Sequence, residues 1–300
     1  MTAPTADTSQ PSRPIATVRV SRAIAVRTIV VSVVAFFASA YGFGHLRAAV
    51  RGESFEPIVV PATAPPDAIG WLVATLGLIV LVVAPHELVH GLFMARYGGS
   101  RTYGVGVSRF LLPYAYAAAD GASYSRNQVL VVVLAPLVGI TAVGVLAMAI
   151  VPSTLLVVAL AVNVAGSIGD CWMAGVLCRY PADVRITALP DGDGRGFGIY
   201  GPTEARDERL SEPSALSRFV LGVVAATVLI AGALLVLVFY SLTVGDGDVV
   251  LAGDGWLLFR HERQPGGSVH LALGARLLAA VAIAGGLVQV AIDRLWRALG

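Results

Sequence analysis

Residues 70–94 read GWLVATLGLIVLVVAPHELVHGLFM, and the only ionisable side chains in this stretch are His86, Glu87 and His90. A helix needs about 20 mostly apolar residues to cross the hydrocarbon core of a bilayer. The stretch therefore predicts a transmembrane helix, and it places all three ionisable side chains toward one end of that helix.

The composition of the whole chain agrees with a membrane protein. The 300 residues are 56% hydrophobic and 13% charged, and their mean hydropathy is +0.78. A water-soluble domain carries about 25% charged residues. These values exclude a soluble protein, a disordered protein and a nucleic-acid-binding protein, so the lipid bilayer is the expected partner. The two cysteines, Cys171 and Cys178, exclude a disulfide framework.

Six stretches are long and apolar enough to span a bilayer, and together they predict an all-α polytopic membrane protein with about six transmembrane helices. They lie at about 24–44, 70–94, 128–151, 154–178, 217–241 and 270–292. The predicted organisation comprises a disordered cytoplasmic segment at 1–23, a transmembrane catalytic core at 24–178, a cytoplasmic loop at 179–216 and a C-terminal transmembrane pair at 217–300.

Two connections between spans predict β structure. Residues 97–126, and 103–116 in particular, alternate small and aromatic residues, which is typical of short strands or re-entrant elements after span two. Residues 245–268 contain two apolar runs with glycine-containing turns and predict an external hairpin between spans five and six.

The arginines predict the orientation. All 21 basic residues are Arg, and sixteen of them lie on the side of the predicted topology that holds both termini. Because cytoplasmic loops carry the excess of basic residues, we expect a multi-pass protein of the plasma membrane with cytoplasmic N- and C-termini.

The sequence His86-Glu87-Leu88-Val89-His90 is an HExxH motif. Positions i and i+4 lie on one face of a helix, so both imidazoles can reach a single metal ion. Glu87 can act as the base that takes a proton from a water molecule. Catalytic zinc needs three protein ligands and an open position, so a third ligand is expected from another span.

Span four supplies the candidate third ligand. Asp170 is the only acidic residue of that span, and it lies at the same predicted membrane depth as His86, about 22 Å from the outer face. Asn163 lies two helical turns earlier on the same face, where its amide could bind a substrate carbonyl or an oxyanion. Interhelical hydrogen bonding is an equally good explanation for Asn163.

The remaining candidates are weaker. Cys171 is better explained as an apolar filler, and Glu204 and Glu208 belong to a loop outside the spans. Three further histidines lie at span ends or on the outer side, where we expect them to be solvated: His45, His261 and His270.

The motif-bearing segments resemble a known group of membrane proteins. Residues 85–91 (PHELVHG), 134–137 (LAPL) and 166–170 (GSIGD) are similar to a family of zincin peptidases, and the likeness covers roughly residues 70–180. More broadly, the pattern resembles intramembrane metalloproteases of the site-2 protease type. That resemblance implies that His86, His90 and Asp170 bind zinc near the cytosolic face and that short strands hold an unwound substrate.

Two functions follow as hypotheses. The first is a zinc-dependent intramembrane endopeptidase that hydrolyses a membrane-embedded protein or peptide, with Glu87 as catalytic base. The second is a metal-binding membrane regulator or transporter without proteolytic activity. A di-iron desaturase needs several histidine clusters, and five histidines with a single cluster argue against it.

Overall fold

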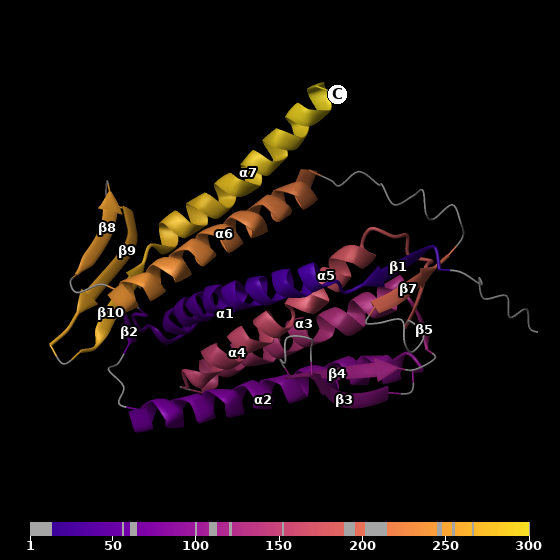
Figure 1. The fold of residues 1–300 in the computed structure, drawn as a ribbon, viewed down its shortest axis with the longest axis horizontal. Helices are drawn as coiled ribbons and strands as arrows, with labels where there is room; N and C mark the ends of the chain where they lie inside the picture. The colour runs from indigo at the N-terminus through magenta and orange to yellow at the C-terminus, as the bar shows by residue number, and fades with distance from the viewer. Residues whose placement is uncertain are drawn as a thin grey trace, which may run out of the picture. The chain divides into compact units, whose positions relative to one another are not determined.

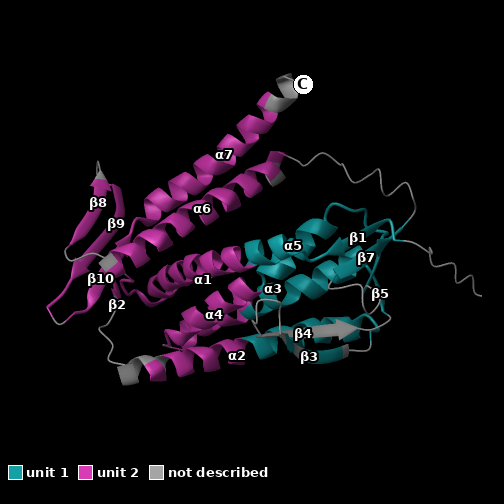
Figure 2. Cartoon of the chain, in the orientation of Figure 1, with its two compact units in different colours: residues 1–28, 83–140, 167–211 teal, residues 29–82, 141–166, 212–300 magenta. Residues whose placement is uncertain are grey.

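A computed structural model provides the structure of the chain. It describes residues 14–55, 57–60, 65–99, 101–107, 113–119, 122–151, 153–188, 196–201, 215–244, 248–253, 256–265 and 267–299. These residues divide into two compact units, shown in Figure 2. Unit 1 comprises residues 1–28, 83–140 and 167–211, and unit 2 comprises residues 29–82, 141–166 and 212–300.

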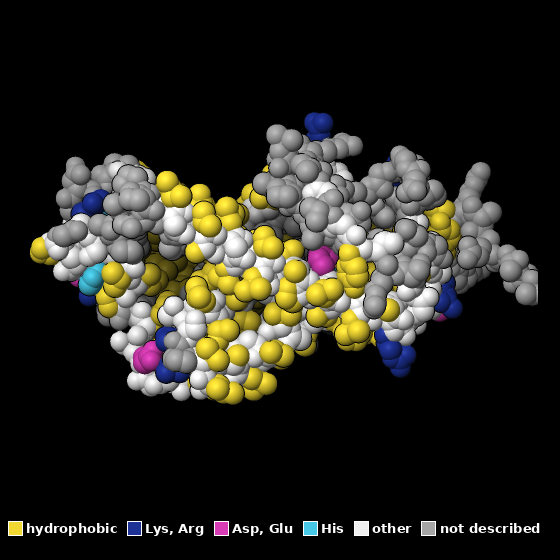
Figure 3. Space-filling model, turned by 90° about the horizontal axis from the view of Figure 1, so that it is seen from below, with side chains coloured by type: hydrophobic (Ala, Val, Ile, Leu, Met, Phe, Trp, Pro, Cys, Tyr) yellow, Lys and Arg dark blue, Asp and Glu magenta, His cyan; other side chains and the backbone are white. Residues whose placement is uncertain are grey.

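The described residues form a mostly helical protein with six stretches long and apolar enough to cross a membrane. Val80 and Leu81 each expose 67% of their surface, which a bilayer would cover. Hydrophobic side chains likewise gather on the face shown in Figure 3. These features indicate a multi-pass membrane protein. The helices are α1 (Arg22–Arg51), α2 (Pro65–Arg96), α3 (Arg126–Ile150), α4 (Leu155–Gly166), α5 (Ile168–Leu177), α6 (Ala215–Val244) and α7 (Ala275–Leu299), drawn in Figure 1.

Span four, predicted at about 154–178, lies at Leu155–Leu177, and one irregular residue divides it into α4 and α5. α4 ends at Gly166 and α5 begins at Ile168, with Ser167 fully buried between them. The interruption is a single residue. The Cys171 N–H donates to the Ser167 carbonyl oxygen at 2.8 Å, which is the first hydrogen bond of α5. Hydropathy alone does not reveal such a break.

Unit 1 contains a four-stranded antiparallel sheet in the order β1-β7-β6-β5. Its strands are β1 (Ala16–Arg19), β5 (Ser123–Ser125), β6 (Arg185–Ala188) and β7 (Gly196–Tyr200). The core beneath it is apolar and consists of Leu177, Val184, Ile186, Phe197 and Ile199.

This sheet corrects one prediction from the sequence and adds detail to another. The segment 1–23 is not disordered throughout, since Ala16–Arg19 form β1, and the loop 179–216 contains β6 and β7. Val18 packs against the apolar core of the sheet, and β1 pairs with β7 over its full length. The order of residues 16–19 therefore comes from a partner some 180 residues away.

A second β element of unit 1 follows α2. β3 (Arg101–Val107) and β4 (Pro113–Ala119) pair antiparallel from Arg101↔Ala119 to Val107↔Pro113. These strands occupy the segment in which short strands were predicted. Insertion of this pair into the membrane as a re-entrant element stays a prediction.

Unit 2 contains a second four-stranded antiparallel sheet in the order β2-β10-β9-β8. Its strands are β2 (Ile58–Val60), β8 (Val249–Gly253), β9 (Trp256–Arg263) and β10 (Val269–Leu273). β8 and β9 form the pair in the segment predicted as a hairpin. The predicted start of span six at residue 270 is wrong, because 269–273 form β10 and α7 begins at Ala275. An apolar strand such as VHLAL satisfies a hydropathy window as well as a helix does.

Helices α6 and α7 of unit 2 pack closely. A methyl group at Gly222, Gly285 or Gly286 would collide with the facing helix, so these glycines permit the contact. Arg218 of α6 and Asp293 of α7 form an ion pair across the same interface.

The membership of each sheet fits alternating membrane crossings. β1 precedes α1, β5 follows α2, and β6 and β7 follow the α4–α5 span, so an even number of spans separates these partners. β2 follows α1 and β8–β10 follow α6, so an even number of spans also separates the strands of the second sheet. Strands can share a sheet only if they emerge on the same side of the membrane, so both sheets agree with six crossings.

Candidate metal centre

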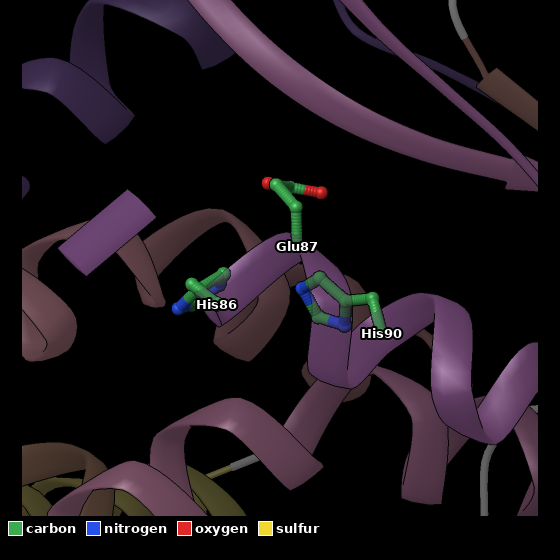
Figure 4. Close-up of side chains that lie close together, drawn as sticks. All are labelled: His86, Glu87 and His90. Atoms are coloured by element: carbon green, nitrogen blue, oxygen red, sulfur yellow. The ribbon is translucent and has the colours of Figure 1, made fainter. Parts of the chain in front are cut away.

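One turn of α2 presents the three side chains of the HExxH motif. Figure 4 shows His86, Glu87 and His90 projecting from this turn. One carboxylate oxygen of Glu87 and one ring nitrogen of each histidine lie within 4.8 Å of one another. The two histidines are buried, with 6% and 7% of their surface exposed, and Glu87 is half-buried. This group could hold a metal ion.

Asp170 reaches the same two imidazoles from α5. Its Oδ2 lies 3.2 Å from His86 Nε2 and 3.5 Å from His90 Nε2. The irregularity at Ser167 puts Asp170 in the first turn of α5. Two elements that are distant in the sequence therefore bring three potential ligand atoms to one point within unit 1.

Two of the separations among these atoms are close to those in a tetrahedral metal site. For metal–ligand bonds of about 2.0–2.2 Å, two ligand atoms of a zinc tetrahedron lie about 3.3–3.6 Å apart. The two nitrogen–oxygen separations, 3.2 and 3.5 Å, are close to this edge length. Two imidazoles and one carboxylate are also a ligand set that catalytic zinc uses. By donor type and by these two separations, His86, His90 and Asp170 could hold a zinc ion.

A backbone carbonyl fixes the orientation of His90. His90 Nδ1 lies 2.8 Å from the carbonyl oxygen of Val132 in α3, which can only accept a hydrogen bond. Nδ1 must therefore carry a proton, and in the neutral imidazole Nε2, the nitrogen that faces Asp170, then has the lone pair that a metal ion would use. Metal-binding histidines typically have such a second partner, which holds the ring and sets its tautomer.

The β3–β4 pair lies against the end of the motif. The ring and hydroxyl of Tyr103 in β3 occupy the space that a methyl group on Gly91 would need. Gly91 follows His90 directly and shares a helix face with Glu87, four residues earlier. The absence of a side chain at Gly91 thus lets a strand approach α2 next to the metal centre.

The structure describes two of the other predicted candidates, Asn163 and Cys171. Asn163 belongs to unit 2, is 1% exposed, and donates from Nδ2 to Thr141 Oγ1 at 3.3 Å. That contact is interhelical, which is one of the two predicted explanations. Its role toward a substrate stays a prediction. Cys171 is exposed, and Glu204 and Glu208 lie outside the described residues.

The three remaining histidines belong to unit 2. His45 and His270 are half-buried. The expectation that His261 is solvated is wrong, because His261 is fully buried beside Ser241 of α6, to which its Nδ1 is hydrogen-bonded. β9 alternates exposed and buried residues, and His261 falls on the buried side together with Phe259.

Two features of the site were missed from the sequence. The Val132 contact uses a backbone atom, so no side-chain pattern reveals it. The contact between Gly91 and Tyr103 was only partly visible in the sequence. A glycine directly after the motif suggests a close neighbour, but the sequence does not show that this neighbour is Tyr103 of β3.

Comparisons with known proteins test the predicted resemblances to zincin peptidases and to site-2 proteases. No curated protein and no solved structure matches the chain. The likeness to site-2 proteases therefore stays a prediction. Residues 79–185, the stretch that contains His86, Glu87, His90 and Asp170, match the model of a family described as "Putative zincin peptidase", which confirms the resemblance to zincin peptidases over this part of the chain.

Proposed function

We propose that the protein is a zinc-dependent intramembrane endopeptidase in which His86, His90 and Asp170 hold the zinc ion. The carrying observation is the approach of Asp170 Oδ2 to both imidazoles, at 3.2 and 3.5 Å, within a helical, apolar setting. The family match over residues 79–185 supports a metallopeptidase.

The proposed chemistry divides between the ion and Glu87. A bound zinc ion lowers the pKa of water and polarises the carbonyl of a peptide bond. Glu87 takes the proton of the attacking water on a carboxylate oxygen and returns it to the leaving amine nitrogen. Val132 keeps the Nε2 lone pair of His90 directed at the site. Asn163 is the proposed donor to the oxyanion.

The proposed substrate is a transmembrane protein or peptide cleaved near the cytosolic face of the plasma membrane. A peptide bond inside a helix is shielded from water, so the substrate must unwind to be cut. β3, which lies against Gly91 beside the motif, is a suitable strand to pair with an extended substrate segment. The arginine distribution supports a cytosolic position for this end of α2 and for both termini.

Substitution of the proposed base tests this function. Glu87→Gln should keep wild-type zinc content and lower peptide-bond hydrolysis by about 10²-fold or more, because general-base catalysis contributes about 10²–10⁴. The measurements are metal analysis of the purified protein and cleavage of a labelled transmembrane peptide in proteoliposomes. Glu53→Gln is the matched control, since Glu53 is an exposed carboxylate paired with Arg47 and Arg51.

The outcomes separate the two hypotheses. Wild-type-like hydrolysis by Glu87→Gln would contradict the proposed mechanism. A wild-type protein that binds zinc through His86, His90 and Asp170 yet cleaves no membrane peptide would instead favour a metal-binding regulator or transporter.

A further inference from the structure

Unit 2 contains a cavity at the end of two candidate spans. It measures about 410 Å³, which is within the range of small-ligand sites. His45 near the end of α1, Trp256 and Leu257 at the start of β9, and Leu273 and Arg276 on either side of the β10–α7 junction line it.

The described lining of the cavity is basic and contains no carboxylate. Arg276 is exposed and makes no ion pair with any residue that the structure describes. Its guanidinium offers up to five N–H donors in a fork that matches phosphate oxygens. His45 adds a ring N–H donor. The polar groups of the cavity thus suit an anion, and Trp256, Leu257 and Leu273 suit an adjoining apolar part.

The aromatic residues behind the cavity hold His45 in place. Its ring makes edge contacts with Tyr41, at 4.5 Å between centroids, and with Phe55, at 4.9 Å. The Tyr41 hydroxyl donates to the carbonyl of Leu273, itself a lining residue. Gly44 allows this arrangement, because a methyl group there would collide with Phe55. A ring fixed in this way loses little conformational freedom when a ligand binds.

The position of the cavity along the helices indicates the source of the anion. The candidate span of α7 begins at Ala275, one residue before Arg276, and His45 lies within the last two turns of α1. A bilayer around these candidate spans would therefore present its phosphate groups at about the level of the cavity. Trp is enriched at membrane–water interfaces, and Arg side chains near the ends of membrane helices extend toward them.

We propose that this cavity binds a phosphate group at the membrane surface, with Arg276 and His45 as donors and with the glycerol end of a phospholipid against Trp256 and Leu257. The inference does not depend on the peptidase proposal, because every residue that carries it belongs to unit 2.

The test uses the full-length protein equilibrated with phosphatidylglycerol and phosphatidylcholine in equal amounts, and native mass spectrometry counts the lipids retained. The wild type should retain phosphatidylglycerol preferentially. Arg276→Gln should weaken this binding about tenfold or more, since a hydrogen bond to a charged group contributes at least that factor. Arg276→Lys, which keeps the charge but loses the fork of donors, should cause a smaller loss than Arg276→Gln.

Arg260→Gln is the matched control, because Arg260 is an exposed arginine of β9 outside the cavity, near Glu262 at 3.7 Å. Circular dichroism of each variant checks folding. A second arm titrates glycerol phosphate in detergent without added lipid. Arg276-dependent binding of glycerol phosphate without lipid preference would assign the phosphate to a soluble ligand. Equal retention of both lipids with no phosphate binding, or wild-type binding by Arg276→Gln, would overturn the inference.

Discussion

The side chain of Asp170 is the strongest evidence for a metal site, because it brings α5 into contact with the two histidines of α2. No local sequence pattern connects these two helices. Asp170 Oδ2 contacts Nε2 of His86 and of His90, while Cys171, the next residue, is exposed. The HExxH spacing was readable from the sequence, since four residues along a helix always return to the same face. The approach of Asp170 depends on how α5 packs beside α2, and the sequence supplied only a matching depth.

Asp170→Asn should lower zinc affinity by more than about 100-fold. Loss of a residue that only orients a ligand costs about 10–100-fold in metal affinity, and an amide in place of a charged ligand should cost more. Competition with a chelator of known affinity measures the change. Asp183→Asn, an exposed aspartate before β6, is the control and should match the wild type. Unchanged affinity in Asp170→Asn would remove Asp170 from the ligand set.

His261 makes a prediction about stability at low pH. Burial lowers the pKa of His261 below its usual value, with the nearby Arg263 acting in the same direction and Asp248 opposing it. The unfolded chain therefore takes up a proton on this ring at a higher pH than the folded chain does. The stabilisation from the neutral ring is complete above the unfolded pKa of about 6.5 and is lost as the pH falls toward the lower folded value.

The Tm of the wild type should accordingly decrease as the pH falls from 7 to 5, and His261→Gln should decrease less steeply. Thermal unfolding followed by circular dichroism at several pH values measures both slopes. His270→Gln is the control, because His270 is a half-buried histidine of the neighbouring strand β10. A wild-type slope in His261→Gln would show that another group governs the acid sensitivity.

At the scale of elements, the contact between α2 and β3 links the β3–β4 pair to the metal centre. A methyl group on Gly91 would collide with the ring of Tyr103. Gly91→Ala should therefore displace the β3–β4 pair, keep the zinc content, and lower hydrolysis about tenfold to a hundredfold, since small misplacement of substrate-holding elements carries such a cost. Cleavage assays and metal analysis on the same preparation measure the two effects.

Two further variants make this prediction specific. Gly77→Ala is a matched control in the same helix, because nothing lies within 4 Å of a methyl group there. Gly91→Ala combined with Tyr103→Ala should recover part of the lost activity by removing the collision. Full activity in Gly91→Ala alone would show that hydrolysis does not depend on the contact between β3 and α2.

The elements differ in how far the sequence predicts them. Apolar runs predicted all six spans, because the bilayer imposes one length on every crossing helix. β1 was missed because its four residues gain order only through pairing with β7 and burial of Val18. The start of α7 was misplaced because Val269–Leu273 is apolar enough for a helix but is held by strands on both sides. Short strands with distant partners carry little local signal.

At the scale of the molecule, six crossings agree with both the arginine distribution and the sheet memberships, although these observations are independent of each other. The arginine distribution reports how positive charge is divided between the loops on the two sides of the membrane. The sheet memberships report which of those loops lie on the same side. Neither observation depends on the metal centre. The proposal that the metal centre lies near the cytosol can therefore be tested by locating the loops, without an activity assay.

The test compares two cysteines in a background in which Cys171 and Cys178 are replaced by alanine. Asp183→Cys marks the turn before β6, and Val250→Cys marks β8, where Val250 is 51% exposed. Because the basic loops are expected to be cytoplasmic, a membrane-impermeant maleimide should label Val250→Cys in intact cells and Asp183→Cys only after permeabilisation. The reverse pattern would place the end of α2 that bears His86 and His90 near the outer face, and a substrate cut there would release its fragment outside the cell.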